Sequence, residues 1–444
     1  MKNILLLLVL ISLHTNLKAQ WNWQALPGAP VSWRCDDIYF LNPDKGWATN
    51  PYYNYLFPNQ FGRVLTTEDG GLTWDVLFDS SQTFIRCVGF TDTLNGWFGN
   101  IADPFFTTDT NFLYHTTDGG STWNPVTNVT GDLPVGICGI SVVTDSVIYA
   151  YGRFMGPAAI MKTIDKGQTW TSQSLSALAS GLIDGYFFNA DTGFITGCYG
   201  PSSKALILST YDGGTSWQVR HQSQKSNELV WKISFPSRNI GYATMEAING
   251  SPDTTYFLKT TDGGLTWQEH VFKTDGFYDL QGIGFINDST GWMGGDYSTP
   301  ENYKTTDGGN TWTVDNTFGI QTPPYNIYGG YSTNRFRKFG DTLMYACGNT
   351  IYKLQIATGI SDMDSPPGSI SIYPNPTANS FTIKINTPKE IGVVEILNVV
   401  GEIVYSENLF GKNVYLIDAN LAKGIYFVRV TDDERIAVRK LIVE

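Results

Sequence analysis

The sequence contains few charged residues and no basic run. Charged side chains make up 16% of the 444 residues, whereas about a quarter is usual in globular domains. This shortage argues against coiled coils and long solvated helices, and the aromatic content of 14% argues against disorder. The 41 acidic residues outnumber the 29 basic residues, so nucleic acid and anionic membrane surfaces are poor candidates as partners.

Histidine and cysteine are also scarce, and their spacing excludes the usual metal and catalytic motifs. None of the four His lies at a metal-ligand spacing from another, and no C-x-x-C pair occurs. H-E-x-x-H, G-x-S-x-G and a P-loop are absent as well. We therefore predict no metal, no cofactor and no catalytic residue. The five cysteines are Cys35, Cys87, Cys138, Cys198 and Cys347. Their odd number favours the interpretation that they are small buried side chains. The alternative is that two of them form one disulfide in an oxidising compartment.

Long apolar runs are missing too, except at the N-terminus. Lys2 is followed by an apolar stretch over 4–13, and Leu17-Lys18-Ala19 ends in a small residue suited to cleavage. Ten apolar residues are too few to cross a bilayer. Residues 1–20 are therefore predicted to be a secretory signal peptide, and no transmembrane segment is expected.

Glycine and tryptophan are present in a regular repeat. The string Thr-x-Asp-x-Gly-x-Thr/Ser-Trp occurs six times, at intervals of 45 to 50 residues, which indicates copies of one supersecondary unit. In such a turn the carboxylate accepts backbone N–H groups, glycine supplies positive φ, and the indole is buried. We predict a structural role, not a catalytic one, for these residues: Asp69, Trp74, Asp118, Trp123, Asp165, Trp170, Asp212, Trp217, Asp262, Trp267, Asp307 and Trp312.

A second pattern, an apolar strand followed by a polar turn and another strand, occurs seven times and is typical of antiparallel hairpins. Seven strand pairs but six Asp turns leave one unit incomplete. Residues 351–354 look like its third strand, and residues 21–24 look like the missing fourth. Joining them closes a ring over residues 21–354, at about 48 residues per unit. The sequence therefore predicts an all-β, seven-bladed β-propeller whose N-terminal strand completes the last blade.

These repeats resemble the Asp-box (bacterial neuraminidase) repeat, and the interleaved strands are similar to propellers of the photosystem II assembly and stability factor family. The resemblance covers about three quarters of the chain. It implies the fold, because propellers of this kind host many unrelated activities. Sialidases with Asp boxes also carry an Arg-Ile-Pro segment, which is absent here.

Candidate binding residues lie on the face opposite the Asp turns, where the loops are unequal in length. Aromatic and Arg side chains there would stack on a sugar or dock a peptide that carries an acidic group. The alternative is that they pack locally. The candidates are Arg34, Tyr52, Tyr53, Tyr55, Phe57, Arg86, Phe105, Phe106 and Trp231.

A pair of carboxylates across a cleft would indicate a glycoside hydrolase instead, sialidase-like or a glycanase. The acidic residues that the loops offer for this role are Asp36, Asp37, Glu246, Asp296 and Glu301. We expect solvated loop acids rather than a catalytic pair.

The last part of the chain differs in composition. A Gly/Ser/Pro-rich linker over 355–369 precedes seven short strands in 370–444, which predict a small β-sandwich. This segment resembles the C-terminal sorting domain of the type IX (Por) secretion system of Bacteroidetes. The matching residues are Tyr373, Pro374, Asn375, Pro376, Gly424, Tyr426 and Lys440.

The sorting resemblance implies contact with the type IX machinery and passage through the periplasm to the outer surface or the medium. Together these observations predict an exported propeller that acts as a non-catalytic binding module for a glycan or a protein. A secreted glycoside hydrolase is the alternative, and an assembly factor is a third hypothesis.

Overall fold

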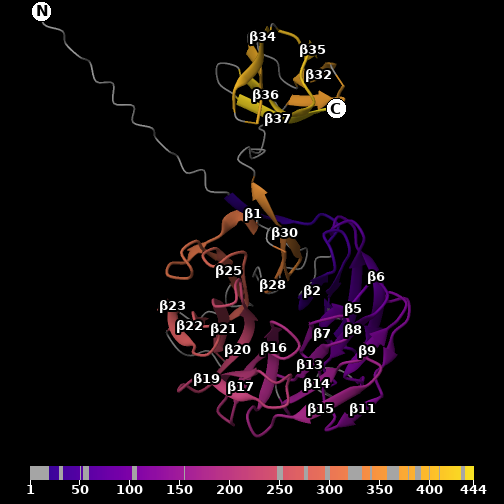
Figure 1. Cartoon of the computed structure of the whole chain (residues 1–444), viewed down its shortest axis with the longest axis vertical. Coiled ribbons are helices and arrows are strands. Elements are labelled where there is room, and N and C mark those ends of the chain that lie inside the picture. Colours follow the sequence, from indigo (N-terminus) through magenta and orange to yellow (C-terminus); the bar gives the residue numbers. More distant parts are fainter. Residues whose placement is uncertain are drawn as a thin grey trace, which may run out of the picture. The chain divides into compact units, whose positions relative to one another are not determined.

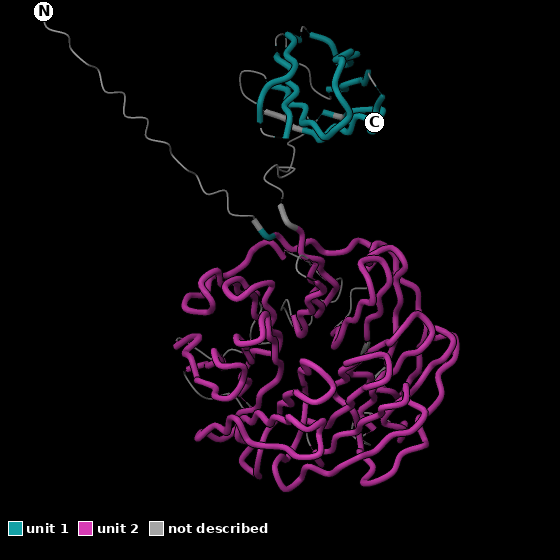
Figure 2. Tube along the Cα trace, viewed as in Figure 1, with its two compact units in different colours: residues 1–21, 356–444 teal, residues 22–355 magenta. Residues whose placement is uncertain are grey.

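The computed structural model describes residues 20–444, except for 30–33, 51, 54–59, 103–107, 155, 248–253, 275–278, 296–300, 319–332, 341–342, 358–369, 379, 386–391, 400, 410 and 432–435. The described residues form two compact units, Asn22–Gln355 and a second that includes Ile356–Glu444 (Figure 2). The predicted signal peptide lies outside the described residues, apart from Gln20. In the part of the chain that is described, no helix has the length and hydropathy needed to cross a membrane.

The described strands of the first unit form seven sheets, here called blades 1 to 7 (Figure 1). Blade 1 contains β2 (Asp37–Phe40), β3 (Gly46–Thr49), β4 (Tyr52–Tyr53), β5 (Gln60–Thr67) and β6 (Asp75–Ser81). Blade 2 contains β7 (Ile85–Phe90), β8 (Gly96–Asn100), β9 (Leu113–Thr116) and β10 (Asn124–Pro125). Blade 3 contains β11 (Val129–Gly131), β12 (Gly139–Val142), β13 (Ile148–Gly152), β14 (Ala159–Thr163) and β15 (Trp170–Ser174).

The remaining blades follow the same order. Blade 4 contains β16 (Gly181–Phe187), β17 (Gly193–Tyr199), β18 (Lys204–Thr210) and β19 (Gln218–Gln222). Blade 5 contains β20 (Glu228–Ser234), β21 (Gly241–Ala247), β22 (Thr255–Thr260) and β23 (Gln268–Lys273). Blade 6 contains β24 (Leu280–Phe285), β25 (Gly291–Gly295), β26 (Tyr303–Thr305) and β27 (Thr313–Val314), followed by the short 3₁₀ helix η1 (Asn316–Phe318). Blade 7 contains β28 (Thr333–Phe339), β29 (Leu343–Gly348), β30 (Ile351–Ala357) and β1 (Gln20–Ala25).

One edge strand of each blade, β12 in blade 3 and β28 in blade 7, lies toward the middle of the ring and is called its inner strand. In Figure 1, β2, β7, β16, β20 and β28 surround the centre, whereas β6, β9, β19 and β23 lie outside. The inner strands are buried along most of their length, and all six residues of β7 are buried. The predicted all-β propeller fold is thereby confirmed.

The two ends of the unit meet in blade 7, because β1 pairs with β30. Leu26 continues this pairing by donating its N–H to the carbonyl of Ile351 at 3.0 Å. Trp23 anchors β1 in the core: it is 3% exposed, stacks on Phe318 at 5.1 Å and meets the edge of Trp292 at 5.3 Å. The N-terminal strand is therefore paired where the sequence predicted it.

Adjacent blades are joined by face-to-face aromatic pairs. Trp47 of β3 stacks on Phe90 of β7 with ring centroids 3.6 Å apart. Tyr242 of β21 stacks on Phe285 of β24 at 3.7 Å, and Tyr149 and Phe187 do the same at 4.0 Å between blades 3 and 4. Stacked rings in this geometry contribute packing energy beyond the buried area alone.

The same kind of pair closes the ring. Tyr345 of β29 in blade 7 stacks on Phe40 of β2 in blade 1 at 3.9 Å and 8°. Tyr345 also donates its hydroxyl to the carbonyl of Gly70 at 3.1 Å. The junction between the last and first blades therefore repeats the contact used elsewhere in the ring.

Each of the six Asp turns is held by one hydrogen-bond pattern, illustrated by the turn around Asp118. The Asp118 carboxylate accepts the backbone N–H of Thr122 at 2.9 Å and the Thr122 hydroxyl at 2.7 Å. The hydroxyl of Thr116 accepts the N–H of Gly120, which has φ of 98°. The tryptophan that follows packs edge-on against another aromatic ring, as Trp123 does with Phe90 at 6.0 Å and Trp170 does with Trp97 of the neighbouring blade at 6.4 Å. The turn and its neighbours thus account for every residue of the repeat.

Two features were not predicted. β10 of blade 2 has only two residues, and Pro125 in it has no N–H to extend a ladder. The chain then forms β11, which pairs in parallel with β15 of blade 3. Blade 3 therefore has a fifth strand at its outer edge.

The second unit is a small sandwich of two sheets. β31 (Ile370–Tyr373), β32 (Ser380–Ile385) and β35 (Val414–Asp418) form one sheet. β34 (Ile403–Leu409), β33 (Gly392–Leu397), β36 (Gly424–Thr431) and β37 (Ile436–Val443) form the other. Alternate residues such as Phe381, Ile396 and Val428 are buried between them in one apolar core. The predicted sandwich is confirmed.

We predict that acid weakens the propeller through the Asp turns. Hydrogen bonds from the turn lower the pKa of Asp69, Asp118, Asp212 and Asp307 to about 2, below the unfolded value of about 3.9. The stabilisation is therefore complete above about pH 4 and is lost as the pH falls through about 2. The unfolding temperature should stay level from pH 7 to 5 and fall steeply between pH 4 and 2.

The variant Asp118→Asn with Asp212→Asn should show a shallower fall, because two of the titrating groups are gone. Asp132→Asn, which changes an exposed carboxylate outside these turns, should match the unmodified chain. Calorimetry measures the unfolding temperature of each protein as a function of pH. Equal profiles for all three proteins would contradict the assignment.

Candidate functional site

The candidate site begins with irregularities at the start of the innermost strands. A register shift, the mark of a β-bulge, occurs in β7, β16, β20, β24 and β28. A bulge bends a strand and re-aims side chains. The residues within or beside the shifts include Arg86, Asp184, Lys232, Gln281 and Arg335.

One buried ion pair crosses the middle of the ring. Arg335 of β28 in blade 7 donates to both carboxylate oxygens of Asp184 in β16, at 2.8 and 2.9 Å. Blade 4 lies three blades from blade 7 in one direction around the ring and four in the other. These side chains therefore meet only at the centre. Asp37 of β2 lies 3.0 Å from Arg335 and 3.1 Å from Arg337.

A second group lies beside the first and gathers side chains from four blades. Asp36 lies 2.6 Å from Arg34 and 3.5 Å from Arg86. The same two guanidinium groups lie over the Trp231 ring of blade 5, at 5.9 and 5.5 Å. Arg34 also donates to Gln281 of blade 6 at 2.8 Å. We call these residues, together with Asp37, Asp184, Lys232, Arg335 and Arg337, the central cluster.

Asp36 and Asp184 of the central cluster stay ionised because the cations outweigh burial. Burial acts to raise the pKa of Asp36, but Arg34 and Arg86 lower it by more, and the net pKa is lowered. Burial likewise acts to raise the pKa of Asp184, and Arg335 and Lys232 reverse the direction. Neither carboxyl group holds a proton near neutral pH.

Lys232 has the opposite character. Lys232 is 3% exposed. Among the described residues, no carboxylate forms an ion pair with it. Burial and the nearby Arg335 lower its pKa, Asp184 acts in the opposite direction, and the resulting pKa is about 8. Lys232 is therefore a buried cation whose charge is only partly compensated.

Several donors in the central cluster also lack an acceptor. Among the described residues, Nε of Arg86, Nη2 of Arg335 and Nε1 of Trp231 are buried without a hydrogen-bond partner. Buried polar groups in proteins are normally satisfied, and an unsatisfied donor costs roughly 1–3 kcal/mol. The central cluster thus has cationic donors available for an acceptor from outside the chain.

The charge balance of the region is positive when Lys232 is protonated. The cations are Arg34, Arg86, Lys232, Arg335 and Arg337. The matching carboxylates are Asp36, Asp37 and Asp184, with Glu246 joined through the side chain of Gln281 at 3.3 Å. The net positive charge of the cluster therefore favours an anionic ligand over a cationic one.

Three of the residues predicted from the sequence meet in this cluster. Arg34, Arg86 and Trp231 are brought together, but they are 3–6% exposed and lie at the centre of the ring instead of on an exposed aromatic face. Tyr52 and Tyr53 form the short strand β4 against β5. Tyr55, Phe57, Phe105 and Phe106 lie outside the described residues.

Sequence reasoning missed Asp184, Lys232, Gln281 and Arg335 as site residues. Each is a polar residue at the start of an otherwise apolar inner strand, and that position was the available signal. That signal does not reveal that the inner strands of opposite blades bring these side chains together at the centre of the ring.

The carboxylates proposed for hydrolysis do not form a free pair. Asp36 and Asp37 are engaged by arginines, as described above. Glu301 accepts the hydroxyl of Tyr303 at 2.6 Å, and Asp296 lies outside the described residues.

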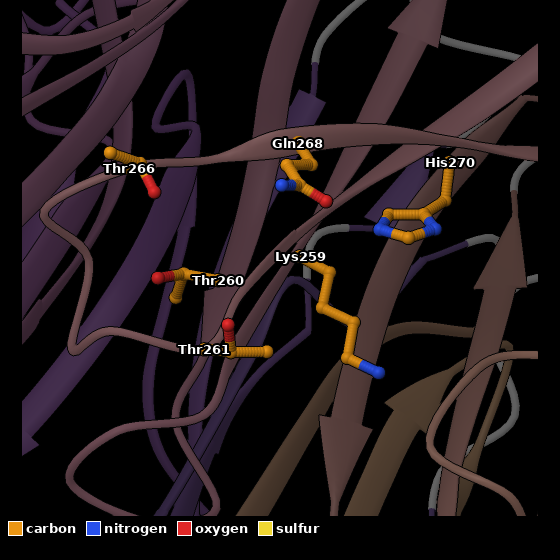
Figure 3. A pocket seen from close by; sticks show the side chains of 6 residues that line it. All are labelled: Lys259, Thr260, Thr261, Thr266, Gln268 and His270. Carbon is orange, nitrogen blue, oxygen red and sulfur yellow. The ribbon is translucent and has the colours of Figure 1, made fainter.

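A shallow pocket on blade 5 has a structural explanation. Its lining includes Thr260 and Thr266, which hold the Asp262 turn, and Lys259, which donates to the carbonyl of Gly308 at 2.7 Å (Figure 3). His270 in the same pocket stacks on Phe257. Among the described residues, no group of three or more His, Cys, Asp or Glu is arranged to hold a metal ion.

The sequence segments matched in the sandwich also lie together. The Asn375 side chain accepts the N–H of Ile442 at 2.9 Å and donates to the carbonyl of Lys440 at 2.7 Å. Gly424 and Tyr426 of β36 pair with Val443 and Leu441 of β37. The three segments therefore form one corner of the sandwich around its last strand.

Comparison with known families identifies this sandwich. Residues 371–444 match the secretion system C-terminal sorting domain. The match indicates an exported protein that the type IX secretion system delivers to the cell surface or the extracellular space. No curated protein sequence matches the chain.

Solved structures similar to the chain include YCF48 bound to D1 peptide, with a TM-score of 0.53 and 18% identity over 76% of this chain and 95% of that one. YCF48 from Cyanidioschyzon merolae has a TM-score of 0.52 and 17% identity, over 75% of this chain and 99% of that one. An ancestral GH74 enzyme has a TM-score of 0.54 and 12% identity, over 95% of this chain and 63% of that one. Identities this low show the shared propeller fold and nothing about activity.

We predict that Lys232→Met raises the stability of the protein at pH 7. The variant removes a buried charge whose pKa is shifted from about 10.5 to about 8, so the free energy of unfolding should rise by up to about 3 kcal/mol. In the unmodified chain the unfolded state binds the proton more tightly, so stability rises as the pH increases from about 8 to about 10.5. Urea unfolding at pH 7 and pH 10 should show that this rise is smaller in the variant.

Lys204→Met, at a partly exposed position of the neighbouring blade, is the control and should leave both values nearly unchanged. Destabilisation by Lys232→Met at pH 7 would contradict the description of Lys232 as an uncompensated cation.

Proposed function

We propose that the propeller is a non-catalytic binding module that holds an anionic group of an extracellular partner in the central cluster. The observation that carries this proposal is the set of buried donors without acceptors on Arg86, Arg335 and Trp231, which lie beside the buried cation Lys232. Burying such donors is costly unless an acceptor satisfies them. This cost is offset when a ligand provides the acceptor.

A carboxylate fits this set of donors best. Guanidinium groups bind planar carboxylates through charge-assisted hydrogen bonds, and the ammonium group of Lys232 adds a compact point charge. Carboxylates occur on acidic side chains, peptide C-termini and acidic sugars. The structure of YCF48 bound to D1 peptide supports a peptide partner, since that similar propeller holds a peptide.

Glycoside hydrolysis is the weaker alternative. It needs two carboxyl groups at a set separation, one of them with a raised pKa, whereas the pKa values of Asp36 and Asp184 are lowered. Burial raises the pKa of Glu228, but Glu228 is 4% exposed and accepts the Ser223 hydroxyl at 2.6 Å. The ancestral GH74 enzyme shares the fold only.

We also propose that the six Asp turns are Asp boxes with a purely structural role. Their carboxylates are engaged by the Thr or Ser hydroxyl and N–H groups of their own turns, as in the turn around Asp118. Such turns stabilise the outer hairpins and leave the centre of the ring available for binding.

We predict that the mature chain binds acidic members of a peptide and glycan array and that Lys232→Met removes this binding. Loss of one buried, charge-assisted contact costs roughly 2–5 kcal/mol, so affinity should fall at least about 30-fold. Affinity should also decrease as the pH rises from 7 to 9, because Lys232 loses its proton near pH 8. Isothermal titration with the best free-acid peptide and its amidated form measures both effects.

Arg220→Met is the matched control, because Arg220 lies on outer strand β19 and donates to Ser209 and Gln218 there. It should bind as the unmodified chain does. Equal affinity for the free-acid and amidated peptides would refute the proposal, and release of shortened glycans would favour the hydrolase alternative.

For the sorting domain, we predict that deleting residues 370–444 leaves the protein in the periplasm. Asn375→Ala should also reduce delivery, because it removes the side chain that ties the Tyr-Pro-Asn-Pro segment to β37. Asn398→Ala, which removes an exposed amide from a turn elsewhere in the sandwich, should be delivered normally. Cell fractionation and immunoblotting measure the outcome, and surface delivery of the deletion variant would overturn the assignment.

A further inference from the structure

Cys35 and Cys347 lie together where the ring closes. Cys35 lies two residues before β2, the inner strand of blade 1, and Cys347 lies on β29 of blade 7. Both side chains are at most 1% exposed and belong to one apolar cluster with Phe40 and Tyr345. Two residues 312 positions apart in the sequence therefore share one buried site.

The two cysteines are in direct contact. The Cys347 thiol donates to the Cys35 carbonyl oxygen at 3.3 Å, and the Cys35 thiol donates to the Asp37 carbonyl oxygen at 3.7 Å. In this structure both are unlinked.

The other cysteines are arranged differently. Cys87 packs with Trp97 and Ile137, Cys138 with Phe84 and Ile101, and Cys198 with Ile183 and Leu229. Among the described apolar clusters, only the one at the closure contains two cysteines. This distribution singles out one pair.

We propose that Cys35 and Cys347 form a disulfide bond in the exported protein and so link the first and last blades covalently. The oxidant is the disulfide of a thiol–disulfide oxidoreductase of the kind found in oxidising compartments. One cysteine thiolate attacks that disulfide and forms a mixed disulfide, and the second thiolate then displaces the oxidoreductase. The two cysteines lose two protons and two electrons, and the oxidoreductase is released as a dithiol.

The order of events follows from burial. Burial raises the pKa of the Cys35 thiol, and the neighbouring Cys347 raises it further, so little thiolate forms in the closed ring. Because the thiolate is the reactive species, oxidation takes place before blade 7 docks fully on blade 1. The bond then fixes a closure that is otherwise held by β1, the Tyr345–Phe40 stack and the Asp37 ion pairs.

The position makes such a bond effective. A cross-link stabilises chiefly by limiting the unfolded chain, and the effect grows with the length of the loop that it closes. The loop from Cys35 to Cys347 contains nearly the whole propeller. The inference does not depend on ligand binding in the central cluster, and a failure of either leaves the other standing.

The test is a peptide map of the full exported chain, recovered from the culture medium, alkylated in denaturant without reductant and digested. A peptide pair linked through Cys35 and Cys347, with the other three cysteines alkylated, supports the proposal. Alkylation of all five cysteines, or a bond between any other two, overturns it.

Thermal unfolding gives a second readout. Reduction of the unmodified chain should lower its unfolding temperature by about 3–8 °C. The double variant Cys35→Ala with Cys347→Ala should unfold at the same temperature with and without reductant, whereas Cys198→Ala should keep the full response. A reductant effect that persists in the double variant would contradict the assignment.

Discussion

The structure depends on one constraint, which is that the ring must close with strands from opposite ends of the propeller sequence. Blade 7 takes β28, β29 and β30 from its C-terminal end and β1 from its N-terminal end. Closure removes the exposed sheet edge that an open array would leave. Trp23, buried against Trp292 and Phe318, holds β1 in place, and the Tyr345–Phe40 stack gives the last junction the same contact as the others.

Closure also determines what happens at the centre. Once the ring is complete, the inner strands of all the blades end around one axis, and their polar side chains are withdrawn from water. Charges in that position must be paired or they destabilise the fold. Asp184 and Arg335 are paired across the ring, whereas Lys232 and the free donors of Arg86 and Arg335 are not fully matched. This difference separates a structural ion pair from the residues that we propose bind a ligand.

The two units have separable roles. The sandwich carries the match to the sorting domain, and its last strand β37 is tied to the Tyr-Pro-Asn-Pro segment through Asn375. The propeller carries the central cluster. Export and the proposed binding thus rest on different residues.

The sequence by itself determined the features that are local and repeated. The Asp turns were predictable because the hydrogen bonds of their Asp and Thr side chains lie within eight residues. The paired ends of the ring were predictable because the repeat counts did not match. The central cluster was not predictable as a whole. Arg34, Arg86 and Trp231 were identified, but their burial was not, and Asp184, Lys232 and Arg335 were missed. Their meeting depends on bulges that turn single side chains inward and on a closed ring that brings residues more than 150 positions apart within 3 Å, and no local sequence pattern encodes either.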